Sequence, residues 1–119
     1  MIERLLLTGA GGRLGSYLRE PLSQLCTELV STDIKNEIGP LYKNEKFISA
    51  DLAKFDEVLP LTEGVTMICH FGAVVDELPF DNLLGPNFIG SYNIWESARR
   101  NSVQRVIYAS SIHAVGMYS

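Results

Sequence analysis

Three glycines at three-residue spacing stand near the start of the chain, in the stretch Thr8-Gly9-Ala10-Gly11-Gly12-Arg13-Leu14-Gly15. An apolar run precedes them and a helical pattern follows. Gly9 suits a tight turn out of a strand, Gly12 lets the backbone approach a pyrophosphate, and Gly15 lets a helix pack closely on a sheet. The helix N-terminus would present N–H groups and a positive dipole end to that anion. The stretch predicts a dinucleotide-binding strand–loop–helix.

Apolar runs and helical patterns alternate along the rest of the chain, which is typical of a parallel sheet with crossover connections. The fold class predicted is α/β, a Rossmann-type doubly wound parallel sheet truncated after the fifth strand, with residues 1–119 as one domain. The predicted strands cover residues 2–8, 28–32, 47–48, 65–71 and 104–109; the helices cover residues 13–25, 53–61 and 87–101; loops cover residues 35–46 and 74–86.

Side-chain spacing predicts which face of two helices is buried. In the helix over residues 13–25, Pro21 is expected to kink or shorten the helix. In the helix over residues 87–101, the aromatic side chains are expected to lie in the core or in a helix–helix contact. The residues predicted for the two apolar faces are Leu14, Leu18, Leu22 and Leu25 in the first helix, and Phe88, Tyr92, Trp95 and Ala98 in the last.

Composition limits the compartment and the partners. A net charge of −4 and a pI near 5.1 argue against nucleic acid or an anionic membrane as a partner. No apolar run approaches the roughly 20 residues that span a bilayer, and no secretory signal is recognised. Cys26 and Cys69 are isolated, so free buried thiols and no metal site are expected. The sequence thus predicts a soluble, cytoplasmic protein.

The carboxyl ends of the predicted parallel strands should share one edge of the sheet. Asp33 follows the second strand, 18 residues beyond Gly15, where a carboxylate can accept both adenosine ribose hydroxyls. Its charge would repel a 2′-phosphate, which favours NAD over NADP, although Arg13 and Lys35 are basic residues nearby that would soften this preference. The alternative is a helix cap or a solvated loop acid.

Other residues at this edge have two interpretations each. Asp51 and Leu52 follow the third strand and could contact the adenine, but Asp51 could equally serve as the N-cap of the next helix. His70 ends the fourth strand and is expected to be a packed histidine rather than a catalytic base. Gly72 and Ser110 complete the set of strand ends.

Together these motifs resemble the extended short-chain dehydrogenase/reductase family, which contains NAD-dependent epimerases and dehydratases. The likeness covers essentially the whole chain and implies NAD as the cofactor. It is carried by the glycine triplet, Asp33, Asp51-Leu52, Phe71-Gly72-Ala73, Asn87 with Gly90, and Ser110-Ser111 before Gly116. The cofactor-binding residues that it implies are Gly9, Gly12, Arg13, Leu14, Gly15, Asp33, Ile34, Asp51, Leu52, Phe71, Gly72 and Ala73.

Within this family the chain is most similar to the uronate dehydrogenases, which implies a sugar or sugar-acid substrate. The likeness implies that Ser111 hydrogen-bonds the reacting substrate oxygen, that His113 contacts the substrate carboxylate region, and that Asn87 helps to place a proton-relay water. Ser110 and Ser111 are also residues that a strand-to-loop turn would favour. Val75 and Ile112 depart from the group's pattern, because the serine and asparagine found there can hydrogen-bond and these side chains cannot.

The family's catalytic tyrosine, with a lysine four residues later, lies on a helix beyond the fifth strand. Tyr118 stands too near the last residue to fill that role. Tyr42 and Lys46 have the right spacing, but they lie between the second and third strands, on the adenosine side. The expectation is the N-terminal portion of a longer enzyme, inactive alone and binding NAD weakly.

Two alternatives stay open on the sequence. The full protein could be a nucleotide-sugar epimerase or dehydratase. If the chain is naturally complete, it could be a non-catalytic NAD-binding module. In the family's usual dimer the helix over residues 87–101 packs against its counterpart, so a homo-oligomer is possible.

Overall fold

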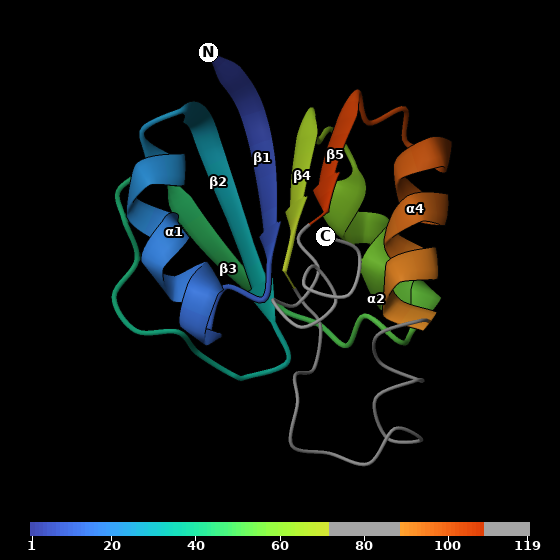
Figure 1. Ribbon diagram of the computed structural model, residues 1–119, viewed down its shortest axis with the longest axis horizontal. Coiled ribbons are helices and arrows are strands. Elements are labelled where there is room, and N and C mark those ends of the chain that lie inside the picture. The colour runs from blue at the N-terminus through green and yellow to red at the C-terminus, as the bar shows by residue number, and fades with distance from the viewer. Residues whose placement is uncertain (72–88, 109–119) are drawn as a thin grey trace, which may run out of the picture.

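The computed structural model describes residues 1–71 and 89–108, which form a central sheet with helices beside it (Figure 1). The strands are β1 (Ile2–Thr8), β2 (Cys26–Asp33), β3 (Glu45–Ser49), β4 (Met67–His70) and β5 (Arg105–Tyr108). The helices are α1 (Arg13–Ser23), α2 (Phe55–Val58), the 3-10 helix η1 (Leu59–Thr62) and α4 (Gly90–Arg100).

The sheet has the strand order β3-β2-β1-β4-β5, and every neighbouring pair is parallel. The central strand β1 pairs with β2 on one side, where Leu5 lies opposite Leu29, and with β4 on the other, where Leu5 lies opposite Met67. All five arrowheads in Figure 1 point toward the same edge. The predicted α/β class and parallel sheet are confirmed.

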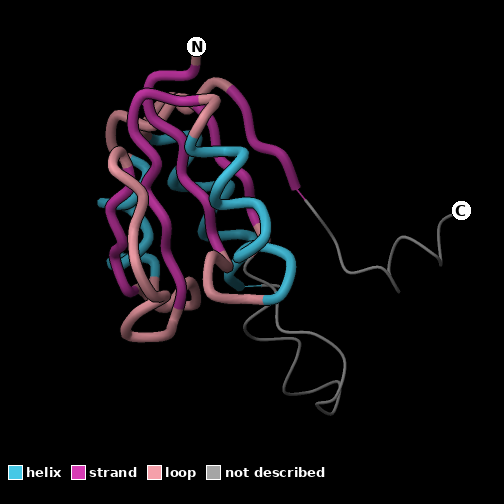
Figure 2. The backbone as a smooth tube through the Cα atoms, turned by 90° about the vertical axis from the view of Figure 1, so that its left-hand side faces the viewer, coloured by secondary structure: helices cyan, strands magenta, loops and turns pink. Residues whose placement is uncertain are grey.

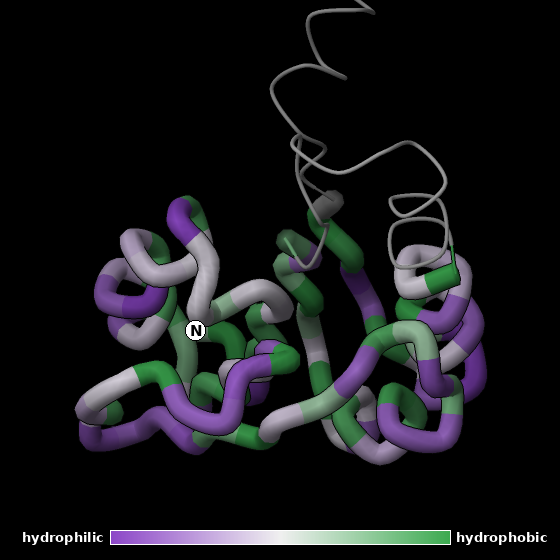
Figure 3. The backbone as a smooth tube through the Cα atoms, turned by 90° about the horizontal axis from the view of Figure 1, so that it is seen from below, coloured by the Kyte–Doolittle hydropathy of each residue, from purple (hydrophilic) through white to green (hydrophobic). Residues whose placement is uncertain are grey.

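Helices cover both faces of the sheet, as a doubly wound fold requires (Figure 2). The α1 face is filled by a cluster that includes Leu5, Leu7 and Leu29, and the opposite face by a cluster that includes Leu6, Ile68 and Ile94. Alternate β1 leucines therefore point to opposite sides. In Figure 3 the hydrophobic colour gathers in the strands between the two outer layers, whereas much of the outer loops and helices is hydrophilic.

The predicted boundaries are close to the observed ones, with two differences in the connections. Residues 53–61 were expected to form one helix, but only Phe55–Val58 is α-helical and the next turn, which carries Pro60, is a 3-10 helix. The predicted loop 35–46 ends earlier, because β3 begins at Glu45. Pro21 lies inside the last turn of α1, which ends at Ser23 instead of Leu25.

The prediction for the apolar face of α1 was right only in part, because Leu18 is half-buried and Leu22 packs against the core cluster on that side of the sheet. Leu14 and Leu25 are exposed, whereas the buried residues of this helix are Gly15 and Arg19. The side of α1 that packs against the sheet includes Gly15, where the helix backbone comes very close to the glycine loop. Arg19, four residues later, lies on the same side of the helix, and a buried carboxylate neutralises its charge.

In α4, Ala98 is buried as predicted, but Tyr92 and Trp95 do not lie in the core; their expected helix–helix contact stays a prediction, and Phe88 lies outside the described residues. Tyr92 and Trp95 are 62% and 56% exposed, and the helix packs instead through smaller residues. Gly90 is one of them: a Cβ there would lie 3.3 Å from the Cβ of Leu52. The chain that leads into α2 thus passes too close to α4 for an aromatic ring. The buried residues of α4 are Gly90, Asn93, Ile94, Ser97 and Ala98.

The described residues contain two free cysteines, Cys26 and Cys69, and both are buried as expected. No helix in this part of the chain has the length and apolar character needed to cross a membrane. Among the same residues, no three histidine, cysteine or acidic side chains gather as metal ligands would.

Candidate cofactor site

The glycine loop joins β1 to α1 at the carboxyl edge of the sheet. Gly9 has a φ of +70°, a conformation that side chains with a Cβ rarely adopt. The turn is held by two backbone hydrogen bonds: the Ala10 N–H donates to the Thr32 oxygen at 3.0 Å, and the Gly12 N–H donates to the Gly9 oxygen at 3.0 Å. The chain therefore leaves β1 and immediately enters the first turn of α1.

Gly15 brings α1 into contact with this turn. A Cβ on Gly15 would lie 2.0 Å from the Gly9 oxygen, whereas one on Gly12 would lie 3.3 Å from the same atom. Gly12 is the N-cap of α1, no side chain caps the helix, and its first turn carries no acid. The N–H groups of that turn have no partner within the helix and point out of its end, as an anion site requires. These features fit the pyrophosphate of a dinucleotide.

Asp33 lies beside the glycine loop, as predicted. Its Oδ2 accepts the Gly11 N–H at 2.9 Å and its Oδ1 accepts the Lys35 N–H at 3.0 Å. The Lys35 ammonium returns across the loop and donates to the Gly11 oxygen at 2.8 Å. The carboxylate thus contacts the glycine loop rather than capping a helix. The neighbouring side chains of Ile34 and Arg13 are exposed.

Asp51 and Leu52 have structural contacts that account for them without a ligand. The Asp51 carboxylate accepts the Ala53 N–H at 3.0 Å and closes the turn before α2, whose N-cap is Lys54. Glu57 accepts the Asp51 N–H at 2.9 Å. Leu52 packs against the core cluster on the α4 side of the sheet. The N-cap interpretation of Asp51 is therefore wrong, because Lys54 is the N-cap and Asp51 closes the turn before it, whereas its contact with the adenine stays a prediction.

His70 belongs to a hydrogen-bonded chain between β1, β4 and α4. The Phe71 N–H donates to Thr8 Oγ1 at 2.8 Å, and the same oxygen is hydrogen-bonded to His70 Nδ1 at 2.7 Å. The other ring nitrogen, Nε2, is hydrogen-bonded to Ser91 Oγ at 3.3 Å. Burial lowers the pKa of His70 to about 4. The prediction of a packed histidine is confirmed for this neutral ring.

Three structural features were not predicted: the contacts of Thr8 and of the Gly11 N–H at this edge, and a buried ion pair between Arg19 and Glu45. Arg19 had a usable signal, because it follows Gly15 by four residues and so shares its helix face. A polar residue at the last position of a buried strand was the signal for Thr8.

Several predicted residues lie outside the described ones. They are Gly72, Ala73, Val75, Asn87, Ser110, Ser111, Ile112, His113, Gly116 and Tyr118. Tyr42 and Lys46 are described and have separate partners: the Tyr42 ring lies by Arg19, and the Lys46 ammonium lies 3.9 Å from Glu28.

Comparison with known proteins places this geometry among nucleotide-dependent enzymes. The profile of the NAD-dependent epimerase/dehydratase family matches residues 5–119. A uronate dehydrogenase of Pseudomonas syringae pv. tomato is 47% identical over 116 residues, which are 98% of this chain and 42% of that enzyme.

Two solved structures are similar as well. The uronate dehydrogenase of Agrobacterium tumefaciens, solved with NAD, has a TM-score of 0.86 at 37% identity, over 93% of this chain and 42% of that one. A glucuronic acid dehydrogenase of Chromohalobacter salexigens has a TM-score of 0.88 at 38% identity, over 95% and 42%. The chain thus spans less than half the length of these relatives.

Proposed function

Because this chain belongs to the NAD-dependent epimerase/dehydratase family, we propose that it forms the cofactor-binding part of an NAD-dependent oxidoreductase. The enzyme would be of the extended short-chain type and would oxidise a sugar acid. The observation that carries the proposal is the close approach at Gly15 with Asp33 fastened to the same loop. Both features are needed to bind a pyrophosphate and the adenosine ribose beside it.

Each residue of the site would have a separate task. The N–H groups of the first turn of α1, from Arg13 to Gly15, would bind the pyrophosphate oxygens. The Asp33 carboxylate, held by the Gly11 and Lys35 N–H groups, would accept the ribose hydroxyls with its remaining lone pairs. Thr8 and Phe71 would fix the ends of β1 and β4 beneath the cofactor. When bound, NAD would supply the hydride acceptor.

The substrate that we propose is a uronate, oxidised at its anomeric carbon to an aldarolactone. The 47% identity to a uronate dehydrogenase supports this class. Ser111 would orient the reacting hydroxyl and His113 would contact the carboxylate, while Val75 and Ile112 would leave that pocket with fewer hydrogen bonds. We further propose a cytoplasmic location, small-molecule rather than nucleic-acid or membrane partners, and a possible homo-oligomer.

The full-length protein that contains this chain is expected to reduce NAD when it is given galacturonate or glucuronate. The test is the rise in absorbance at 340 nm, with Ser111→Ala as the variant that should slow turnover. A protein that binds NAD but gives no rise with either uronate would contradict the uronate proposal. Conversion of a nucleotide sugar without net NADH would instead identify an epimerase or dehydratase.

Asp33→Asn is expected to relax the preference for NAD over NADP. The substitution removes the charge that would repel a 2′-phosphate. The dissociation constant for NADP divided by that for NAD should therefore fall roughly tenfold. Calorimetric titration with each cofactor measures it. Asp51→Asn is the matched control, since its carboxylate closes a turn before α2, and it should leave the ratio unchanged. An unchanged ratio in Asp33→Asn would show that Asp33 does not select the cofactor.

A further inference from the structure

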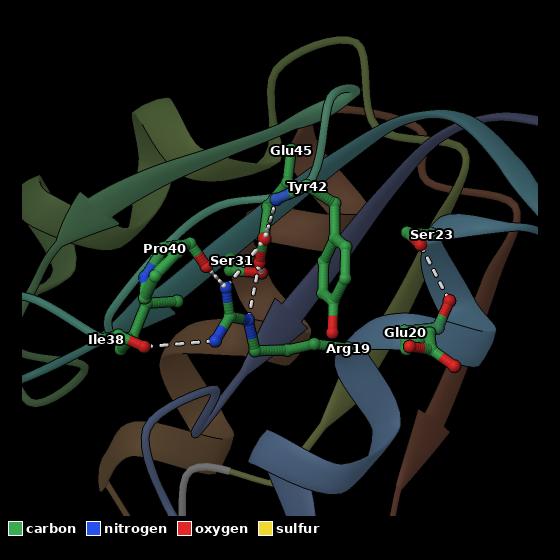
Figure 4. Close-up of polar contacts among 8 residues, drawn as sticks. All are labelled: Arg19, Glu20, Ser23, Ser31, Ile38, Pro40, Tyr42 and Glu45. Carbon is green, nitrogen blue, oxygen red and sulfur yellow. Dashed lines mark hydrogen bonds and ion pairs between the residues drawn. The ribbon is translucent and has the colours of Figure 1, made fainter.

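A buried ion pair lies on the face of α1 that packs against the sheet. Arg19 follows Gly15 by one helical turn, and its side chain reaches toward Glu45 at the start of β3 (Figure 4). The side chains are 9% and 0% exposed, respectively. Charges removed from water to this extent need several partners, because desolvation opposes the charged form.

The Glu45 carboxylate accepts four hydrogen bonds. Arg19 donates from Nε to Oε2 and from Nη2 to Oε1, both at 2.8 Å. Ser31 donates its hydroxyl to Oε2 at 2.6 Å, and the Tyr42 N–H donates to Oε1 at 3.0 Å. Burial alone would raise the pKa of Glu45, but these donors outweigh it and hold the pKa below its ordinary value. The carboxylate therefore stays charged at neutral pH.

Arg19 has further contacts that an ion pair does not need. Its Nη1 donates to the Ile38 oxygen at 3.0 Å, and its Nη2 donates to the Pro40 oxygen at 2.8 Å. The guanidinium carbon lies 5.5 Å from the centroid of the Tyr42 ring. The pair thus fastens residues 38–42, part of the connection from β2 to β3, at three places.

The same connection borders the glycine loop. If Gly11 carried a Cβ, that atom would lie 3.1 Å from Ile38 Cγ2 and 3.1 Å from Lys35 Cδ. The Gly11 N–H in turn binds the Asp33 carboxylate. Ile38, the first of residues 38–42, therefore lies against the glycine loop near Asp33, on the side where the proposed function puts the adenosine.

Stability alone does not explain this arrangement. A buried ion pair can often be replaced by apolar side chains of similar volume without loss of stability, whereas removing one partner is strongly destabilising. What apolar side chains cannot do is bind the Ile38 and Pro40 carbonyl groups. The forked guanidinium is suited to several acceptors at once.

We infer that Arg19 and Glu45 are positioning residues. They hold residues 38–42 in place, with Ile38 against the glycine loop, so that the binding surface for the adenosine end of NAD is already formed before NAD binds. The inference rests on the proposed function. Without the pair, the connection would have to be ordered when the cofactor binds, and that cost would appear as weaker binding.

The double variant Arg19→Met/Glu45→Met tests the inference, because it removes both charges and keeps the volume. It is expected to unfold at a higher urea concentration than Arg19→Met alone, which leaves the Glu45 charge buried without its partner. The dissociation constant for ADP-ribose should nevertheless rise roughly tenfold in the double variant. Nicotinamide mononucleotide should bind unchanged. Amide hydrogen exchange should become faster in residues 38–42 and not in β1.

Arg4→Met/Glu28→Met is the matched control. This arginine–glutamate pair joins β1 to β2, away from the glycine loop, so ADP-ribose should bind as in the wild type. If the charge-free pair Arg19→Met/Glu45→Met does not fold, Arg19→Lys replaces it: the ammonium keeps the charge but loses the fork, and ADP-ribose must again bind more weakly.

The outcomes separate the two proposals. A wild-type protein that binds neither NAD nor ADP-ribose would overturn the proposed function. A wild-type protein that binds both, with an unchanged ADP-ribose constant in the folded Arg19 variants, would overturn the positioning role alone.

Discussion

Gly15→Ala is expected to abolish NAD binding and to lower the free energy of unfolding by about 3 kcal/mol. The added Cβ would lie 2.0 Å from the Gly9 oxygen and 2.8 Å from the Gly9 carbonyl carbon. Both are backbone atoms of the turn, so no side-chain rotation relieves the clash. Helix α1 would have to move away from β1, and the N–H groups of its first turn would move with it.

Urea denaturation and calorimetric titration with NAD measure the two effects. Gly64→Ala is the control, since Gly64 has a positive φ of +70° and lies near the Arg4 side chain instead of the glycine loop. It should lose about 1 kcal/mol of stability from backbone strain and bind NAD normally. If the alanine variant at position 15 bound NAD like the wild type, the close approach would have no role in the cofactor site.

The free energy of unfolding is expected to fall by about 3 kcal/mol as the pH falls from 6.5 to about 4, because of His70. Burial lowers its pKa from 6.5 to about 4, so between these values the unfolded chain binds a proton that the native protein does not. Stability therefore rises with pH across this window. It is fully present above pH 6.5 and is lost as the pH approaches 4.

Urea midpoints measured at intervals between pH 4.5 and 7.5 give the slope. His70→Gln has no imidazole to titrate and should show a much flatter dependence, whatever its absolute stability. Glu45 does not interfere in this window, because its pKa lies below the ordinary 4.5 and its contribution is lost only at lower pH. Equal slopes in the wild type and His70→Gln would show that His70 is not a buried, uncharged imidazole in the native protein.

The parallel arrangement of the strands and the place of Asp33 could be predicted from the sequence because each depends on local signals. The glycine spacing predicted the turn after β1. The positions where apolar runs stop at polar residues predicted the ends of the strands. Asp33 was found because it ends a strand next to that turn. Residues 111 and 113, on which the proposed chemistry depends, lie outside the described residues, so their roles stay predictions.

The buried helix faces could be predicted only in part, because they depend on distances between elements. Hydrophobic spacing assumes that large apolar residues face the core, but Gly15 and Gly90 bring α1 and α4 too near their neighbours. Trp95 is therefore exposed while Asn93 is buried and donates to the Leu52 oxygen at 2.8 Å. Arg19 was missed for the related reason that its partner, Glu45, stands 26 residues away.

The central place of β1 has a consequence for folding during synthesis. Strands β1, β2 and β3 lie within residues 2–49 and can pair as soon as that part of the chain has left the ribosome. The other edge of β1 pairs only with β4, which begins at Met67. At roughly 5–20 residues per second, that edge stays open for about 1–4 seconds. An unpaired edge can bind another chain. The arrival of β4 ends the interval in which nascent chains can aggregate through β1.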